Sequence, residues 1–218
     1  MQKHAKKRVQ ILLYSGIVAF AVYILYAAIG NYLWVEYNPI TTDISSLAAV
    51  DAPNQTPLSI LNTAYFVLFE IFMFTHTFWS FYSKKHVCVK IGAVFLLVMS
   101  IVSTIGYKLF PLSGDKTVMT FGNMMHIIVT VAVVFLSVAG LYLTAAGYLK
   151  RKNTKKFGKF MIIAATVFTI LGLTNPIGMG AGLNVLGLTE RAAIYSLHLV
   201  IGIIGIYEAQ DCYRLYDY

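Results

Sequence analysis

The hydrophobic residues of this chain are grouped in six long stretches that short polar segments separate. Each stretch is close to the roughly 20 residues that a helix needs to cross the hydrocarbon core of a bilayer. A membrane barrel would instead show alternating segments of about 10 residues. The pattern predicts an all-α membrane protein, with residues 1–218 forming one integral domain that is a six-helix bundle. The predicted helices cover about residues 9–33, 59–81, 88–109, 120–148, 160–175 and 190–207, and the fifth is expected to end at Pro176.

The composition supports this class. Hydrophobic residues make up 58% of the chain and charged residues only 12%, against a usual charged share of roughly 25%. A soluble domain could not cover its surface with so few polar side chains. The same numbers exclude intrinsic disorder, and two cysteines are too few for a disulfide-stapled secreted fold.

The positive charges predict the orientation of the bundle. All of the 17 Lys and Arg except Lys108, Lys116 and Arg191 lie before the first predicted helix, in or beside the connections after the second and fourth, or in the C-terminal tail. Because Lys and Arg accumulate on the cytoplasmic side, both termini are expected in the cytoplasm of a cell with a bacterial-type cytoplasmic membrane. The net charge of +8 then reflects topology and attraction to anionic lipid. We therefore expect membrane lipid as a partner and no nucleic acid, while the sequence does not indicate an oligomeric state.

Ionisable residues within the predicted helices are the first place to look for function, because a charge in hydrocarbon is costly. Counted at 1.5 Å per residue, Glu70, His126 and His198 lie roughly 9–16 Å below the outer face. They therefore share the outer half of the bilayer. His76 lies near the opposite face, on another side of its helix from Glu70, and its role is not indicated.

Polar residues recur at helical spacing on four of the predicted helices, including Ser100, Ser103 and Thr104 on the third and a stripe through His198 and Gly202 on the sixth. Lipid cannot satisfy such groups, so we expect these stripes to face inward. They predict a polar pocket that opens outward, with Asp43 and Asp115 in the loops above it. An alternative is that Ser and Thr only join helices by hydrogen bonds, and that Arg191 forms a structural ion pair with Asp115 or Glu70. The predicted lining residues are Glu70, Tyr107, Asn123, His126, Arg191 and His198.

Three short segments stand at the outer ends of the predicted helices. They are Asn-Pro-Ile and Asp-Ile-Ser-Ser-Leu within 38–47, Leu-Phe-Pro at 109–111 followed by Asp115 and His126, and Gly-Leu-Thr-Glu-Arg at 187–191. Together they resemble the bacterial domain-of-unknown-function family 998, whose members are six-span membrane proteins; the likeness covers about residues 10–207. Ala48 is a departure, since the family pattern has Gly there. A more remote resemblance to Frag/DRAM/Sfk-type membrane proteins implies a role with lipids by analogy alone.

These observations favour a protein that binds or handles an envelope lipid or another amphiphile, with Arg191 on an anionic part of the ligand. One alternative is an intramembrane hydrolase or transferase acting on lipid, in which His126 and His198 hold zinc with Asp115 or Glu70. The residue spacing does not support this, and no HExxH, P-loop or GxSxG motif is present. Another alternative is a small-solute or proton-coupled transporter that uses Glu70 or His198, although no inverted repeat is visible. Whether the protein is an enzyme stays open, and no cofactor beyond the zinc of that alternative is indicated.

Overall fold

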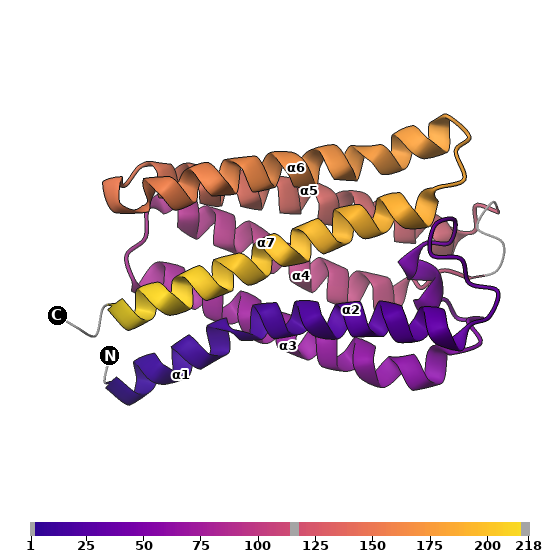
Figure 1. The fold of residues 1–218 in the computed structure, drawn as a ribbon, viewed down its shortest axis with the longest axis horizontal. Coiled ribbons are helices and arrows are strands. Elements are labelled where there is room, and N and C mark those ends of the chain that lie inside the picture. The colour runs from indigo at the N-terminus through magenta and orange to yellow at the C-terminus, as the bar shows by residue number, and fades with distance from the viewer. Residues whose placement is uncertain (1–2, 114–117, 215–218) are drawn as a thin grey trace.

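A computed structural model describes residues 3–113 and 118–214, and within these residues all regular structure is helical. The first helix, α1 (Lys3–Leu13), turns at Tyr14 into α2 (Ser15–Leu33). Figure 1 shows the long helices running back and forth along one axis. Further elements follow α2 in chain order. They are the 3₁₀ helix η1 (Ile44–Ala48), α3 (Gln55–Tyr82), α4 (Val87–Leu109), α5 (Phe121–Leu149), the 3₁₀ helix η2 (Lys152–Thr154), α6 (Lys155–Gly180) and α7 (Leu186–Arg214).

Six helical segments in the described part of the chain are long and apolar enough to cross a membrane, with α1 and α2 counted as one. This confirms the predicted six-helix membrane bundle. Helices α2 to α7 form a closed ring in which each packs on its neighbour in sequence and α7 returns to α2, while α1 packs on α3 and α7. The start of α1 and the end of α7 lie at one end of the bundle (Figure 1). We call this the basic end, because the Lys-rich connections lie there, and the opposite end the loop end.

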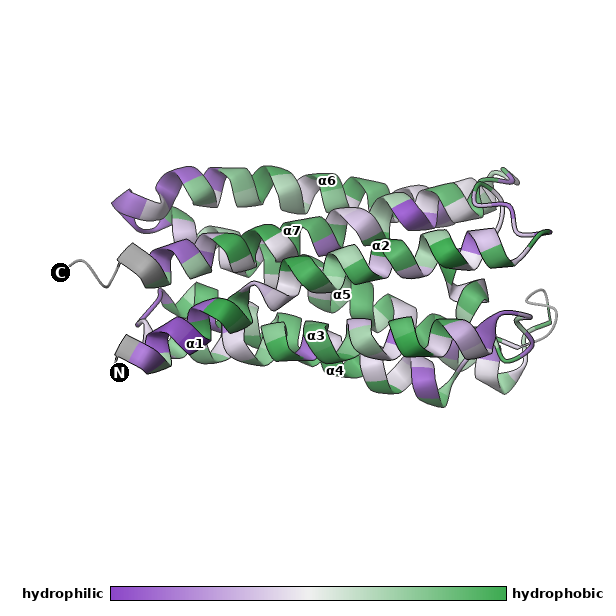
Figure 2. Ribbon diagram, turned by 60° about the horizontal axis from the view of Figure 1, so that its bottom comes forward, coloured by the Kyte–Doolittle hydropathy of each residue, from purple (hydrophilic) through white to green (hydrophobic). Residues whose placement is uncertain are grey.

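The helices are mostly hydrophobic along their length, and hydrophilic residues gather toward the two ends of the bundle (Figure 2). Large side chains such as Phe135, Ile163 and Phe74 are more than half exposed. Backbone polar groups cannot be hydrated in hydrocarbon, so helices that satisfy them internally are the expected solution. An apolar exposed face of this extent fits lipid as the surrounding solvent.

Small residues allow α4 and α5 to approach each other closely. A Cβ at Gly92 of α4 would lie 2.4 Å from the Thr144 hydroxyl oxygen and 2.7 Å from the Gly140 carbonyl oxygen of α5. Any larger residue at this position would clash. Close contacts at small residues are common between membrane helices. Inside the ring, Phe72, Leu96 and other apolar side chains are fully buried.

Several helices extend beyond the predicted limits, and α6 and α7 do so the most. Helix α6 continues through Pro176 to Gly180, so the predicted end at that proline was wrong. A proline removes one backbone hydrogen bond, whereas unwinding the helix in lipid would expose several. Helix α7 extends on both sides of the predicted 190–207, which brings Glu208 into the span.

Candidate functional site

At the loop end, Arg191 of α7 holds the first loop. Its guanidinium donates hydrogen bonds to the carbonyl oxygens of Pro39 (2.7 Å), Thr42 (3.0 Å) and Gly187 (2.9 Å), and to the Tyr37 hydroxyl. The loop passes directly over Gly187, where a Cβ would lie 2.2 Å from the Thr42 carbonyl oxygen. One helical turn later, Arg191 therefore reaches the same carbonyls. The guanidinium contacts the loop and not Glu70.

The neighbouring residue Glu190 holds the start of η1. Its carboxylate accepts hydrogen bonds from the Ile44 backbone N–H and from the Ser45 hydroxyl, the latter at 2.8 Å. Asp43, predicted to lie above a pocket, is buried, and its side chain accepts a hydrogen bond from Ser46 within η1. The Tyr37 hydroxyl donates to the Asp43 carbonyl. Burial raises the pKa of Tyr37 to about 12, although Arg191 acts in the opposite direction.

A second polar group joins α5 to the connection that precedes it. The Asn123 side chain hydrogen-bonds to the backbone of Ser113 and Val118, on either side of the undescribed residues 114–117. His126 Nδ1 lies 2.8 Å from the Phe110 carbonyl oxygen. Tyr107 packs on the His126 ring with centroids 4.7 Å apart. This group therefore fixes the ends of α4 and α5, and Asp115 lies outside the described residues.

His198 lies inside an aromatic cluster between α2, α3 and α7. Its Nε2 lies 2.7 Å from the Tyr65 hydroxyl and its Nδ1 lies 2.8 Å from the Ile194 carbonyl oxygen. The Tyr23 ring stacks on the imidazole with centroids 4.9 Å apart. Both ring nitrogens thus have protein partners, as a buried polar group requires.

Glu70 faces α4. Its carboxylate accepts hydrogen bonds from Ser100 (3.0 Å) and Thr104 (2.7 Å). The hydroxyl stripe of α4 that the sequence showed is thus what satisfies this carboxylate.

Among the six predicted lining residues, the structure brings Tyr107 and His126 into contact, with Asn123 one turn earlier on the same helix. Glu70, Arg191 and His198 each contact a different set of partners. Within the described ranges, no group of three or more His, Cys, Asp or Glu side chains could hold a metal ion.

The basic end contains a buried ionisable group that the sequence did not reveal. His76 Nδ1 of α3 lies 2.7 Å from Glu208 Oε2 of α7, and both side chains are 0% exposed. The Tyr148 hydroxyl of α5 donates to Glu208 Oε1, also at 2.7 Å. Three helices are therefore tied together by one carboxylate. Ionisable groups at such depth are expected to be paired and are functional candidates by default.

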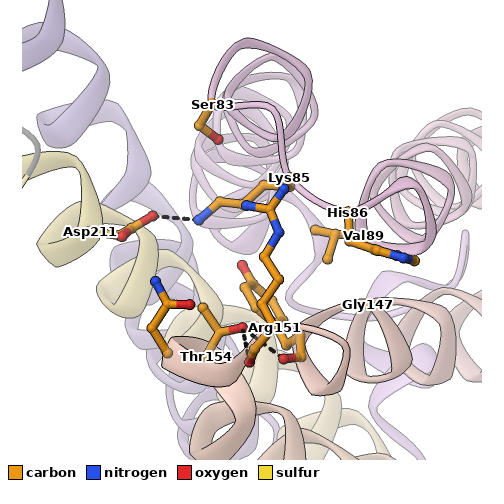
Figure 3. Close-up of a pocket in the computed structure, with 10 residues that line it drawn as sticks. Ser83, Lys85, His86, Val89, Gly147, Arg151, Thr154 and Asp211 are labelled. Carbon is orange, nitrogen blue, oxygen red and sulfur yellow. Dashed lines mark hydrogen bonds and ion pairs between the residues drawn. The ribbon is translucent and has the colours of Figure 1, made fainter.

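Beside this group lies a cavity of about 160 Å³. Lys85, at the turn between α3 and α4, forms an ion pair with Asp211 of α7 across it, and its ammonium lies 5.6 Å from the Tyr148 ring centroid. Figure 3 shows Arg151 and Thr154 on another side of the same space. The cavity is lined by Ser83, Lys85, His86, Val89, Gly147, Tyr148, Arg151, Asn153, Thr154 and Asp211.

The prediction missed this end because it ended the last helix at Tyr207. A signal was present: the stripe formed by His198 and Gly202 continues at helical spacing through Gly205 to Glu208. His76 was recognised as separate from Glu70, and the structure agrees, since the two residues contact α7 and α4 respectively. Its partner could not be read from one sequence.

The fold defines an all-helical, multi-pass membrane protein. The model of the family described as "Protein of unknown function (DUF998)" matches residues 17–207, and the chain belongs to this family. The resemblance stated from the sequence is thereby confirmed, whereas the more remote likeness to Frag/DRAM/Sfk-type proteins is not shown. No curated protein and no solved structure matches the chain.

Proposed function

We propose that this protein binds an anionic lipid or a similar amphiphile, with the headgroup in the cavity at the basic end. The observation that carries the proposal is the cavity itself, in which two cationic side chains, Lys85 and Arg151, stand at the polar end of an apolar bundle. The ligand class is the one expected from the sequence. The proposed place differs, because Arg191 is engaged by loop carbonyls.

The cations suit a phosphate-type headgroup. An ammonium has three donors, and the contact between Lys85 and Asp211 uses one of them. Arg151 is exposed at the cavity rim, where its guanidinium donates to the Lys84 carbonyl. A planar guanidinium keeps further donors for phosphate oxygens.

An apolar groove lies beside the cavity, on the other side of Tyr148. The Tyr148 ring packs edge-on against Phe157 and Tyr207, with centroids 5.0 and 5.6 Å apart. Phe157 and Tyr207 stack on each other at 3.6 Å and line the groove. A polar cavity and an apolar groove separated by one aromatic layer match the two halves of an amphiphile, and we assign the groove to an acyl chain.

The test compares two variants that each remove one positive charge from the basic end. Arg151→Gln removes a cavity side chain, and Lys159→Gln removes an exposed lysine of α6 that does not line the cavity. Full-length proteins are placed in nanodiscs of equal phosphatidylglycerol and phosphatidylcholine, and native mass spectrometry measures the lipids each retains. One charge-assisted hydrogen bond contributes about 1.5 kcal/mol or more, which corresponds to roughly a tenfold change in affinity.

We expect the wild type and Lys159→Gln to retain phosphatidylglycerol and Arg151→Gln to lose the preference. General attraction of anionic lipid to a basic surface would weaken retention equally in both variants. Equal losses, or a wild type without lipid preference, would therefore contradict the cavity site.

The proposal places the basic end at the cytoplasmic face of the cell membrane, following the distribution of Lys and Arg. A cysteine replacing Val35, which is 92% exposed in the first loop, should then react in intact cells with a thiol reagent that does not cross the membrane. A cysteine replacing Lys156 should react only after the cells are opened. The reverse result would move the site to the outer leaflet.

A further inference from the structure

The Glu208 carboxylate is held from both sides by groups that exchange protons. His76 contacts Oε2 and the Tyr148 hydroxyl contacts Oε1, each at 2.7 Å. A phenol can donate a hydrogen bond to a carboxylate, and it can equally accept one from a carboxylic acid. The geometry around Glu208 is therefore compatible with both its ionised and its protonated form.

The same face of α3 carries further polar atoms in the interior. His76, Trp79 and Ser80 are spaced i, i+3 and i+4, so they lie on one side of the helix. All three residues are 0% exposed. In the described part of the chain, no hydrogen-bond partner meets His76 Nε2, Trp79 Nε1 or Ser80 Oγ. Unsatisfied buried polar atoms are few in native proteins, and each calls for an explanation such as a catalytic or ligand-binding role.

The His76 imidazole also has a ring nitrogen that can accept a proton. When Nδ1 donates to the Glu208 carboxylate, Nε2 of neutral histidine carries a lone pair. This is the atom that has no partner among the described residues. In a purely structural ion pair, Nε2 would be expected to have a hydrogen-bond partner as well.

We propose that His76 and Glu208 form a buried proton-binding site that exchanges one proton with the basic-end cavity through the Tyr148 hydroxyl. In the exchange, the phenolic proton passes to Glu208 Oε1 while a hydronium ion in the cavity supplies a proton to the Tyr148 oxygen and becomes water. The phenol is unchanged, and the summed charge of the pair changes from −1 to 0. The proton belongs to the pair as a coupled unit, and it is held at Glu208 Oε1.

The charged and titratable groups around the pair come from several elements. Tyr148 of α5 donates to Glu208, and the Lys85 ammonium of the α3–α4 turn lies 5.6 Å from the Tyr148 ring centroid. Asp211 of α7 is paired with Lys85. From α1, the Lys6 carbonyl accepts a hydrogen bond from the Cys212 thiol of α7. The Lys85 cation beside the entrance favours the ionised carboxylate, so release of the proton toward the cavity leaves a stabilised site.

The site shares the basic-end cavity with the proposed lipid headgroup, but its ligand is a proton and its entrance is the Tyr148 hydroxyl. Protonation changes a charge at the point where α3, α5 and α7 meet. The two proposals are measured separately, one by retained lipid and the other by titration of labelled side chains.

The experiment uses full-length protein in nanodiscs, labelled with ¹⁵N in histidine and ¹³C in the glutamate carboxyl, and followed by NMR as pH is varied. His76→Gln and Glu208→Gln assign the two signals. Tyr148→Phe removes the hydroxyl and keeps the ring. Tyr142→Phe is the matched control, because this tyrosine lies on the same helix and its hydroxyl contacts Thr166 in an exposed position.

We expect the His76 and Glu208 signals to shift together in one step in the wild type and in Tyr142→Phe. In Tyr148→Phe the midpoint should move, and proton exchange of the pair with water should slow. Signals that do not move over the pH range would show a permanent structural ion pair and overturn the proposal. Equal exchange in the two phenylalanine variants would overturn the role of Tyr148. The wild-type titration needs no variant, so it can refute the proposal even if a mutant protein misfolds.

Discussion

Replacing Arg191 by Gln should loosen the first loop from α7. The guanidinium makes three hydrogen bonds to carbonyls, of which the one to Pro39 is exposed and can be replaced by water. The bonds to Thr42 and Gly187 are partly buried. Hydrogen bonds to charged groups contribute about 1.5–3 kcal/mol each. Counting only the two partly buried bonds at the lower figure gives a loss of about 3 kcal/mol in the free energy of unfolding.

Unfolding by titration with a denaturing detergent measures that free energy, and limited proteolysis measures opening of residues 34–54. The control is Lys108→Gln, an exposed cation at the loop end of α4, for which we expect a change of at most about 1 kcal/mol. Arg191→Lys should lose a part of the stability, because an ammonium cannot span the same carbonyls as a planar fork. Wild-type stability and protease resistance in Arg191→Gln would refute the interpretation that this arginine anchors the loop. If Arg191→Gln instead changed the lipid content while the loop stayed intact, Arg191 would be assigned to ligand binding.

Three further outcomes follow from the packing and from one titration. His76→Ala leaves the buried Glu208 carboxylate without its hydrogen bond from His76 and should lower the free energy of unfolding by about 1.5–3 kcal/mol; a loss below about 1 kcal/mol would mean that the pair is hydrated. Gly92→Ala should cost about 1–3 kcal/mol through overpacking, whereas Gly172→Ala, where nothing lies within 4 Å of the new Cβ, should be neutral or slightly stabilising. The Tyr37 pKa is raised from 10.0 to about 12 by burial, so the stability from the neutral phenol is complete below pH 10 and disappears as pH rises through the folded value. Tyr37→Phe should remove this alkaline loss, and an unchanged alkaline profile would contradict the assignment.

The candidate residues divide into those whose setting the sequence could suggest and those it could not. The Glu70 carboxylate and the hydroxyl stripe of α4 were both visible as inward faces, and they do meet. Arg191 was correctly placed at the start of the last helix, yet its partners are backbone carbonyls. The spacing of side chains along a helix does not reveal which backbone carbonyls will face it when a loop folds back over a glycine.

The basic end shows the same limit more clearly. Lys85, Tyr148 and Glu208 come from three distant parts of the chain, and each has an ordinary explanation when seen alone. A lysine is expected on the cytoplasmic side, and a tyrosine is common at a membrane interface. Glu208 lay beyond the predicted end of the last helix. They become a site only in the folded protein, where Tyr148 donates to Glu208 and the Lys85 ammonium lies beside the Tyr148 ring.

The sequence by itself determined the class, the number of spans and the family. The length of a hydrophobic stretch is a local property, and it must match the thickness of the bilayer. The segments that indicate the family can likewise be recognised along the chain. Tertiary structure decided which polar residues meet. A helix presents several faces at once, and the neighbour on each face depends on the order of the ring and on close contacts such as that at Gly92. The continuation of α6 through Pro176 was likewise decided by the surroundings, since lipid makes an unwound backbone more costly than one missing hydrogen bond.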